Sequence, residues 1–277
     1  MNSTISQALK IARFDLGTSI RTSKAVVTMA VYAGLALLVA AVTTFLQNKL
    51  LAEPGVQEGL KTQMDQIQQV ISAALGNDTL LANHLVNMPV ALMVFFWLTQ
   101  SFLPLLIAVI SSDMLNREIR TKSARFVLLR ASRSSLVIGK WLSHTTVFVA
   151  AIVLSWVVFL GYLAFNLNGF NLFQSIPLIM KFFGFTLLIG FCYLGLTSLM
   201  SSLVDGSGTA LLLTIVVLLF LAGLAQSDMF GWASPSHYRY KIWSPRADEI
   251  LAGVGAYVLF GSLFLSAAWQ RFLRRDI

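Results

Sequence analysis

Residues 25–46 read AVVTMAVYAGLALLVAAVTTFL, a run of twenty-two residues without a charged side chain. About 20 apolar residues in a helix, at 1.5 Å each, cross the ~30 Å hydrocarbon layer of a membrane. The chain of 277 residues is 57% hydrophobic and 12% charged, whereas a soluble domain is about 25% charged. Five more charge-free runs follow, at about 89–112, 141–165, 182–203, 208–226 and 250–270. The sequence therefore predicts an all-α integral membrane protein with six transmembrane helices, forming a single domain over residues 1–277.

The basic residues are distributed unevenly across the predicted membrane. Six spans place both termini on one side, which collects fourteen of the twenty Lys and Arg residues, and five lie on the other side. Because Lys and Arg are enriched in cytoplasmic segments, we expect both termini to be cytoplasmic. No cleavage-site pattern follows the first apolar run, so we expect no signal peptide. The expected location is the cell membrane, specifically a bacterial inner membrane, with the chain as a multi-pass protein.

The N-terminal segment 1–24 has the pattern of an amphipathic helix. An apolar stripe at spacings of three or four is formed by Ile5, Leu9, Ala12, Leu16 and Ile20. Lys10, Arg13 and Asp15 lie elsewhere on the helical wheel. Such a helix lies along the membrane surface with its basic residues toward lipid headgroups. The alternative is a cytoplasmic stub without fixed structure.

Two sizeable loops are predicted on the external side. Residues 47–88 carry apolar residues at helical spacing and predict an amphipathic helix of about five turns. It would pack as a lid on the membrane domain, or against a second copy or an envelope partner. Residues 227–249 are rich in aromatics and contain two Ser-Pro pairs, which break helices. Trp and Tyr suit the membrane–water boundary. Between these loops, VDGSG at 204–208 predicts a tight turn joining two spans.

Several enzyme classes lack support. Gly139–Lys140 would need a Gly in place of Ser134 and a Ser or Thr in place of Trp141 to form a phosphate loop. None of the three His residues has a metal ligand at a suitable spacing. A serine hydrolase built on the GSG at 206–208 would need a buried His base, which the last three spans lack. We expect no metal site, no cofactor in this chain and no nucleic-acid partner.

Ion-coupled transport also lacks support, because such carriers keep ionisable residues inside their spans. Here Asp113, Lys181 and Asp205 lie at span ends, and hydroxyls and Gln100 remain as the polar groups of the interior. The energy source is therefore expected outside this chain.

The connector 117–140, REIRTKSARFVLLRASRSSLVIGK, carries seven of the twenty basic residues. Apolar residues follow each basic cluster, which predicts a helix, a turn near residues 130–135 and re-entry into the third span. Apolar area together with Arg donors suits docking into a groove of a soluble partner. The alternative is that these charges set topology and contact anionic lipid. Composition alone leaves both open.

These residues resemble the first cytoplasmic loop of ABC type-2 permeases, the membrane subunits of type V ABC exporters. In that family a Glu follows the second span, and a pattern like R-x-x-I-x-x-G-K leads into the third. Glu118 and RSSLVIGK at 133–140 stand at those places, after an N-terminal IARFDL and before IWSP at 242–245. Two departures are TKS at 121–123, where the family often has Gly-Thr, and Arg130, where it often has Pro.

The resemblance implies a function and a set of residues. Two permease copies, as a homodimer, would enclose a pathway in the membrane lipid, and two separate ABC ATPase subunits, which bind ATP and Mg, would dock beneath. The segment 113–140 would couple ATP hydrolysis to the spans through Glu118, Arg120, Arg125, Arg130, Arg133, Gly139 and Lys140. The elbow helix 1–24 would act through Arg13, Asp15 and Arg21. Short re-entrant helices in 227–249 would form an outer gate with Trp243 and Pro245.

A second class of function stays open on the sequence. The chain could be a non-transporting scaffold or sensor subunit of an envelope complex, using the external loop 47–88. Dependence on an ATPase separates the two classes. The transported substrate cannot be derived from the residues.

Overall fold

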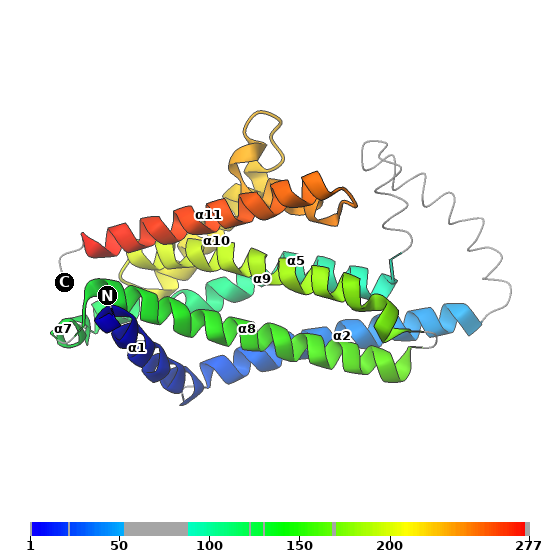
Figure 1. Cartoon of the computed structure of the whole chain (residues 1–277), viewed down its shortest axis with the longest axis horizontal. Helices are drawn as coiled ribbons and strands as arrows, with labels where there is room; N and C mark the ends of the chain where they lie inside the picture. Colours follow the sequence, from blue (N-terminus) through cyan, green and yellow to red (C-terminus); the bar gives the residue numbers. More distant parts are fainter. Residues whose placement is uncertain are drawn as a thin grey trace.

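The computed structural model describes residues 2–21, 23–52, 88–121, 123–129, 131–167 and 170–274. Every regular element in these ranges is a helix (Figure 1). The α-helices are α1 (Asn2–Arg21), α2 (Lys24–Ala52), α5 (Val90–Ser111), α6 (Asn116–Arg120), α7 (Ser123–Leu128), α8 (Arg133–Asn166), α9 (Leu172–Leu203), α10 (Ser207–Leu224) and α11 (Ala247–Leu273). Two 3-10 helices, η1 (Gly231–Ala233) and η2 (Pro235–Trp243), lie between α10 and α11.

Six helices are long and apolar enough to cross a membrane, which confirms the predicted fold class. They are α2, α5, α8, α9, α10 and α11, and the turn predicted at 204–208 joins α9 to α10. Two of them begin earlier than hydropathy indicated, α8 by eight residues and α9 by ten. Polar caps explain both starts: the Ser132 side chain accepts from the backbone N–H of Ser135, and Asn171 accepts from that of Gln174.

The apolar core is centred on α5, whose aromatic side chains stack on two neighbouring helices. The rings of Phe95 and Phe159 lie 4.0 Å apart between centroids, and those of Phe96 and Phe182 lie 4.1 Å apart. All four side chains are fully buried. The helices therefore form one packed bundle, in which α5 contacts α2 and α9, α2 packs along α8, and α11 packs along α9.

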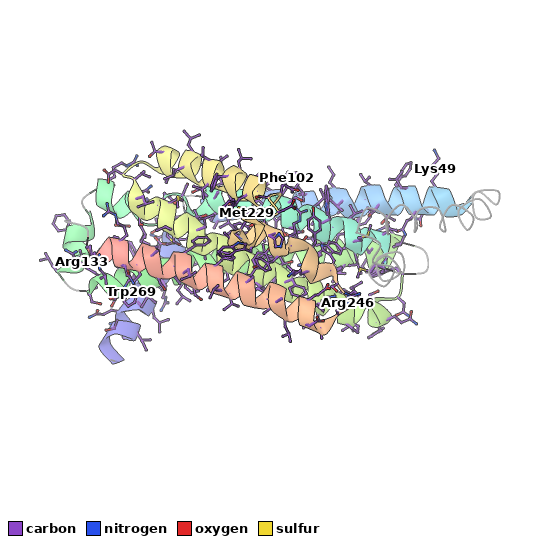
Figure 2. The ribbon with its side chains drawn as sticks, turned by 90° about the horizontal axis from the view of Figure 1, so that it is seen from above. Lys49, Phe102, Arg133, Met229, Arg246 and Trp269 are labelled. Carbon is purple, nitrogen blue, oxygen red and sulfur yellow. The ribbon has the colours of Figure 1, made fainter. Side chains whose placement is uncertain are left out.

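One end of the bundle, here called the terminal end, brings together the start of α1 and the end of α11 (Figure 1). At this end α1 meets the start of α8, where the Ser135 hydroxyl donates to the carbonyl of Thr4 at 3.2 Å. The end of α11 lies there too, because Arg133 Nη1 donates to the carbonyl of Leu273 at 2.7 Å. Figure 2 shows Arg133 and Trp269 at this end and Arg246 toward the other.

The predicted amphipathic N-terminal segment is a helix from Asn2 to Arg21, and Ser23 forms a turn between it and α2. Along α1, the basic side chains of Lys10, Arg13 and Arg21 are exposed, as are the apolar side chains of Ile5 and Leu9. Its position at a membrane surface stays a prediction. The external helix predicted within 47–88 lies outside the described residues, and residues 47–52, which were predicted as the start of this loop, continue α2 instead.

Candidate functional site

The first part of the site is the close crossing of α1 over α8. A Cβ added at Gly139 would lie 2.7 Å from the carbonyl oxygen of Ala8 and 2.8 Å from Cβ of Ile11. These distances are shorter than van der Waals contact, so a side chain at this position would push the two helices apart. Ala8 and Ala12 are buried as well, at 3% and 4% exposure. Small residues thus hold α1 directly against the start of α8.

One residue after Gly139, a buried ion cluster joins three helices. Lys140 Nζ lies 2.5 Å from Asp15 Oδ1 on α1 and 2.8 Å from Glu118 Oε1 on α6. The side chains of Lys140, Asp15 and Glu118 are only 7%, 10% and 18% exposed. Because an isolated charge is costly to bury, each member depends on the others for compensation. We call this group the Asp15–Lys140–Glu118 cluster.

A histidine of the next helical turn extends the cluster toward the membrane interior. His144 Nε2 lies 3.9 Å from Asp15 Oδ2, and His144 Nδ1 lies 3.2 Å from the Ser111 hydroxyl at the end of α5. Asp15 Oδ2 is buried and has no hydrogen-bond partner among the described residues. The cluster thus connects the N-terminal helix to the ends of two predicted spans.

The segment from α5 to α6 is fixed to the bundle from the other side. The hydroxyl of Ser201 on α9 accepts hydrogen bonds from the backbone N–H groups of Leu115 and Asn116, at 3.0 and 3.3 Å. A small core lies beside these bonds, formed by Met114, Leu115, Leu136, Val137 and Phe272. The start of α6 is therefore held by α8, α9 and α11 together.

Beyond this fixed base, the loop carries two largely exposed apolar side chains that line a cavity shared with α1. Phe126 on α7 is 75% exposed, and Leu129, directly after α7, is 81% exposed. Between this loop and α1 lies a cavity of about 720 Å³. Its walls include Ile11 and Phe14 of α1, and the Asp15–Lys140–Glu118 cluster lines it as well. We call Phe126 and Leu129 the loop tip.

The structure brings together four of the residues selected from the sequence and separates the others. Asp15, Glu118, Gly139 and Lys140 meet at the α1–α8 crossing. Arg133 binds the last turn of α11 through the Leu273 carbonyl, which complements the negative end of that helix. Arg120, Arg13 and Arg21 are exposed. Arg125 belongs to α7 but its side chain lies outside the described part, as does the whole of Arg130.

Trp243 lies in another part of the molecule, beside the middle of α5. Its indole N–H donates to Gln100 Oε1 at 3.1 Å, and its ring lies 4.9 Å from that of Phe96. The indole is buried in the core, whereas the sequence pattern placed it at the membrane–water boundary. Pro245 follows η2 and is exposed. Their part in an outer gate stays a prediction.

Two polar partners near Trp243 were missed as site residues on the sequence. Arg239 of η2 donates to Gln100 Oε1 at 3.4 Å and to the Ser101 hydroxyl at 2.8 Å. Gln100 stands out as an amide inside an apolar span, and Arg239 as a basic residue within an aromatic loop. Their separation of 139 residues hides the pairing.

Comparison with known families identifies one match. The sequence model of a family described as ABC-2 family transporter protein matches residues 9–246, which include α1 from residue 9 onward, the loop between α5 and α8, and both 3-10 helices. No curated protein matches the chain.

Proposed function

Because the chain belongs to the ABC-2 family of transporter proteins, we propose that it is the permease subunit of an ATP-driven exporter. In this proposal two copies form the pathway, and two separate ATPase subunits dock on the segment 117–140. The observation that supports the coupling role most directly is a contrast along this segment. The loop tip is exposed, whereas the start of α6 is held by three helices, α8, α9 and α11.

The exposed tip is suited to receive a partner. Phe126 and Leu129 are large apolar side chains at 75% and 81% exposure, and Phe14 on the neighbouring α1 is also exposed, at 79%. Exposed apolar groups rimmed by polar residues are typical of protein–protein contacts. Arg117 and Arg120 of α6 are exposed near this tip, so the surface complements an acidic or polar groove.

The buried base is suited to pass a movement on. A displacement of α6 would reach α1 and α8 through the ion pairs of Glu118 and Asp15 with Lys140, because breaking a buried pair is costly. It would also reach α9 through the hydrogen bonds that Ser201 accepts. In this proposal Gly139, Lys140 and Asp15 act behind the docking surface rather than on it. A load applied to the tip would thus move four helices together.

The docking role is tested by replacing Phe126 and Leu129 together with serine. Loss of two apolar anchors should weaken ATPase binding at least about tenfold, since interface hot spots typically contribute about 2 kcal/mol or more each. The ATPase should co-purify poorly with the variant, and the amount of permease in the membrane should stay near normal because neither side chain is packed. Phe165→Ser is the matched control, because this side chain is 91% exposed at the far end of α8.

Unchanged co-purification in the Phe126→Ser/Leu129→Ser variant would remove the loop tip from the docking surface. Full function without any ATPase would favour the scaffold or sensor alternative. Arg133 is unsuited to this test, because its hydrogen bond to the Leu273 carbonyl stabilises the end of α11.

The proposed orientation has its own test. With the terminal end in the cytoplasm, a reporter fused after Asp276 should be active only as a cytoplasmic marker, and one inserted near Gly76 only as an external marker. The uneven distribution of Lys and Arg motivates this expectation. Two reporters on the same side would contradict the arrangement of six spans with cytoplasmic ends.

A further inference from the structure

Arg239 occupies an unusual depth for a charged side chain. It lies on η2, and its hydrogen bonds join it to Gln100 and Ser101, the eleventh and twelfth residues of the 22-residue helix α5. Ten residues of α-helix extend about 15 Å, half of a typical hydrocarbon layer. In Figure 2, Met229 of the segment that precedes η1 and Phe102 of α5 lie between the two ends of the long axis.

The groups that surround the Arg239 guanidinium in the structure are neutral. It donates to the Ser101 hydroxyl and the Gln100 carbonyl oxygen, and its Cζ lies 5.9 Å from the centre of the Trp97 ring. Within the described ranges it forms no ion pair with a carboxylate. A guanidinium at mid-depth is costly unless it faces water or an anion, and such residues mark substrate pathways in membrane proteins.

The side chain of Gln100 supplies a second donor beside Arg239. Gln100 is 4% exposed, and its Oε1 accepts from both Arg239 and Trp243. Because Oε1 is the acceptor in both hydrogen bonds, the other terminal atom of the Gln100 side chain is the NH₂ nitrogen, Nε2. That nitrogen is buried and has no hydrogen-bond partner among the residues described. An unsatisfied donor beside a guanidinium is an arrangement that an anionic oxygen would complete.

The face of α5 that carries this group continues as an apolar stripe. Trp97, Ser101 and Leu105 follow one another at i, i+4 spacing and share a helix face. Trp97 and Leu105 are 52% and 42% exposed. A molecule with its anionic group at Arg239 could therefore lay an apolar chain along this stripe. The donors at Arg239 alone do not select a ligand, and neither does the apolar stripe. Together they suit an amphiphile with a negatively charged head.

We propose that Arg239 and the NH₂ group of Gln100 bind the anionic head of a transported single-chain amphiphile, a carboxylate or phosphate whose apolar chain lies along Trp97 and Leu105. Ser101 positions the guanidinium, because its hydroxyl accepts from Arg239 and donates to the carbonyl of Trp97. This inference rests on the proposed exporter function and names the class of its cargo. Trp243 positions the site, because its indole N–H helps to fix the orientation of the Gln100 amide.

The test is the binding of radiolabelled dodecyl phosphate to the purified chain in discs of zwitterionic lipid, measured without ATPase. Wild type should show saturable binding above empty discs, and dodecyltrimethylammonium should not compete.

Arg239→Gln should weaken binding at least tenfold, and Arg239→Lys less, because lysine keeps the charge but loses the planar donor geometry. Gln100→Glu should also weaken binding at least tenfold, since its carboxylate would pair with Arg239. Arg246→Gln is the matched control, because this exposed arginine already lies 3.2 Å from Glu249, and its binding should equal wild type.

Three outcomes would overturn the proposal. Equal affinity of wild type and Arg239→Gln would remove Arg239 from an anion site. Competition by the cationic amphiphile would show apolar adsorption only. Loss of dodecyl phosphate binding in discs of anionic phospholipid would assign the site to a bilayer lipid instead of a cargo. Because the measurement contains no ATPase, its failure leaves the docking role of the loop tip unaffected, and failure of docking leaves this site unaffected.

Discussion

Replacing Lys140 with methionine should lower the free energy of unfolding by about 3–5 kcal/mol, the range typical for breaking a buried ion pair. Methionine has a similar length and fills the same space, so the loss is electrostatic. The carboxylates of Asp15 and Glu118 would then lie buried beside each other without the ammonium that lies 2.5 and 2.8 Å from them. Burial weakens solvent screening, so their repulsion adds to the loss of the ion pairs.

The chain offers its own probe for this measurement. Cys192 is the single cysteine of the sequence and is buried in α9. Its reaction with a thiol-reactive dye during heating therefore reports unfolding, and the midpoint should fall by several degrees in Lys140→Met. Lys49→Met, at an exposed position near the far end of α2, is the control and should unfold like wild type.

A compensating variant separates charge from packing. Asp15→Asn and Glu118→Gln combined with Lys140→Met remove all three charges while they keep the side-chain sizes. Replacing a complete buried ion network with neutral groups is often neutral, so most of the lost stability should return. If Lys140→Met unfolded at the wild-type temperature, the Asp15–Lys140–Glu118 cluster would not stabilise the α1–α8 crossing.

The membrane spans were predictable because hydropathy is a property of consecutive residues. Each of the six helices contains a charge-free run of 18 or more residues, long enough to be recognised as a membrane span without knowledge of its neighbours. The starts of α8 and α9 were less accurate, because polar caps such as Ser132 and Asn171 decide where those helices begin. The first turns of α8 carry Arg133 and Lys140, which look like loop residues on a hydropathy scale.

The site was only partly predictable, because its pairings cross long sequence separations. Family resemblance selected Asp15, Glu118 and Lys140, but their meeting depends on how α1 crosses α8, since Asp15 and Lys140 are 125 positions apart in the sequence. One available signal was that Asp15 is the single acidic residue in residues 1–24. The resemblance grouped Gly139 and Lys140 with the residues that couple to the ATPase. In the structure they contact α1, and the loop tip carries the exposed surface. Their coupling role stays a prediction.

Gly139→Leu should separate α1 from α8 and lower the free energy of unfolding by about 3 kcal/mol, at the upper end of the range for overpacking. A Cβ there meets the Ala8 carbonyl oxygen at 2.7 Å, and backbone atoms cannot rotate away as a side chain can. Displacement of α1 should also withdraw Asp15 from Lys140. Trypsin should therefore cleave after Lys10 and Arg13 faster than in wild type, as measured by mass spectrometry of the released peptides.

The matched control for this substitution is Gly161→Leu in the same helix. A Cβ at Gly161 meets nothing within 4 Å, so leucine there adds no overlap. Leucine favours a helix over glycine by up to about 1 kcal/mol, so this variant should be as stable as wild type or more stable. The same intrinsic gain operates at residue 139, and any loss of stability there measures the contact with α1 alone. Wild-type protease protection and stability in Gly139→Leu would contradict the close crossing, and with it the fixed base on which the coupling proposal depends.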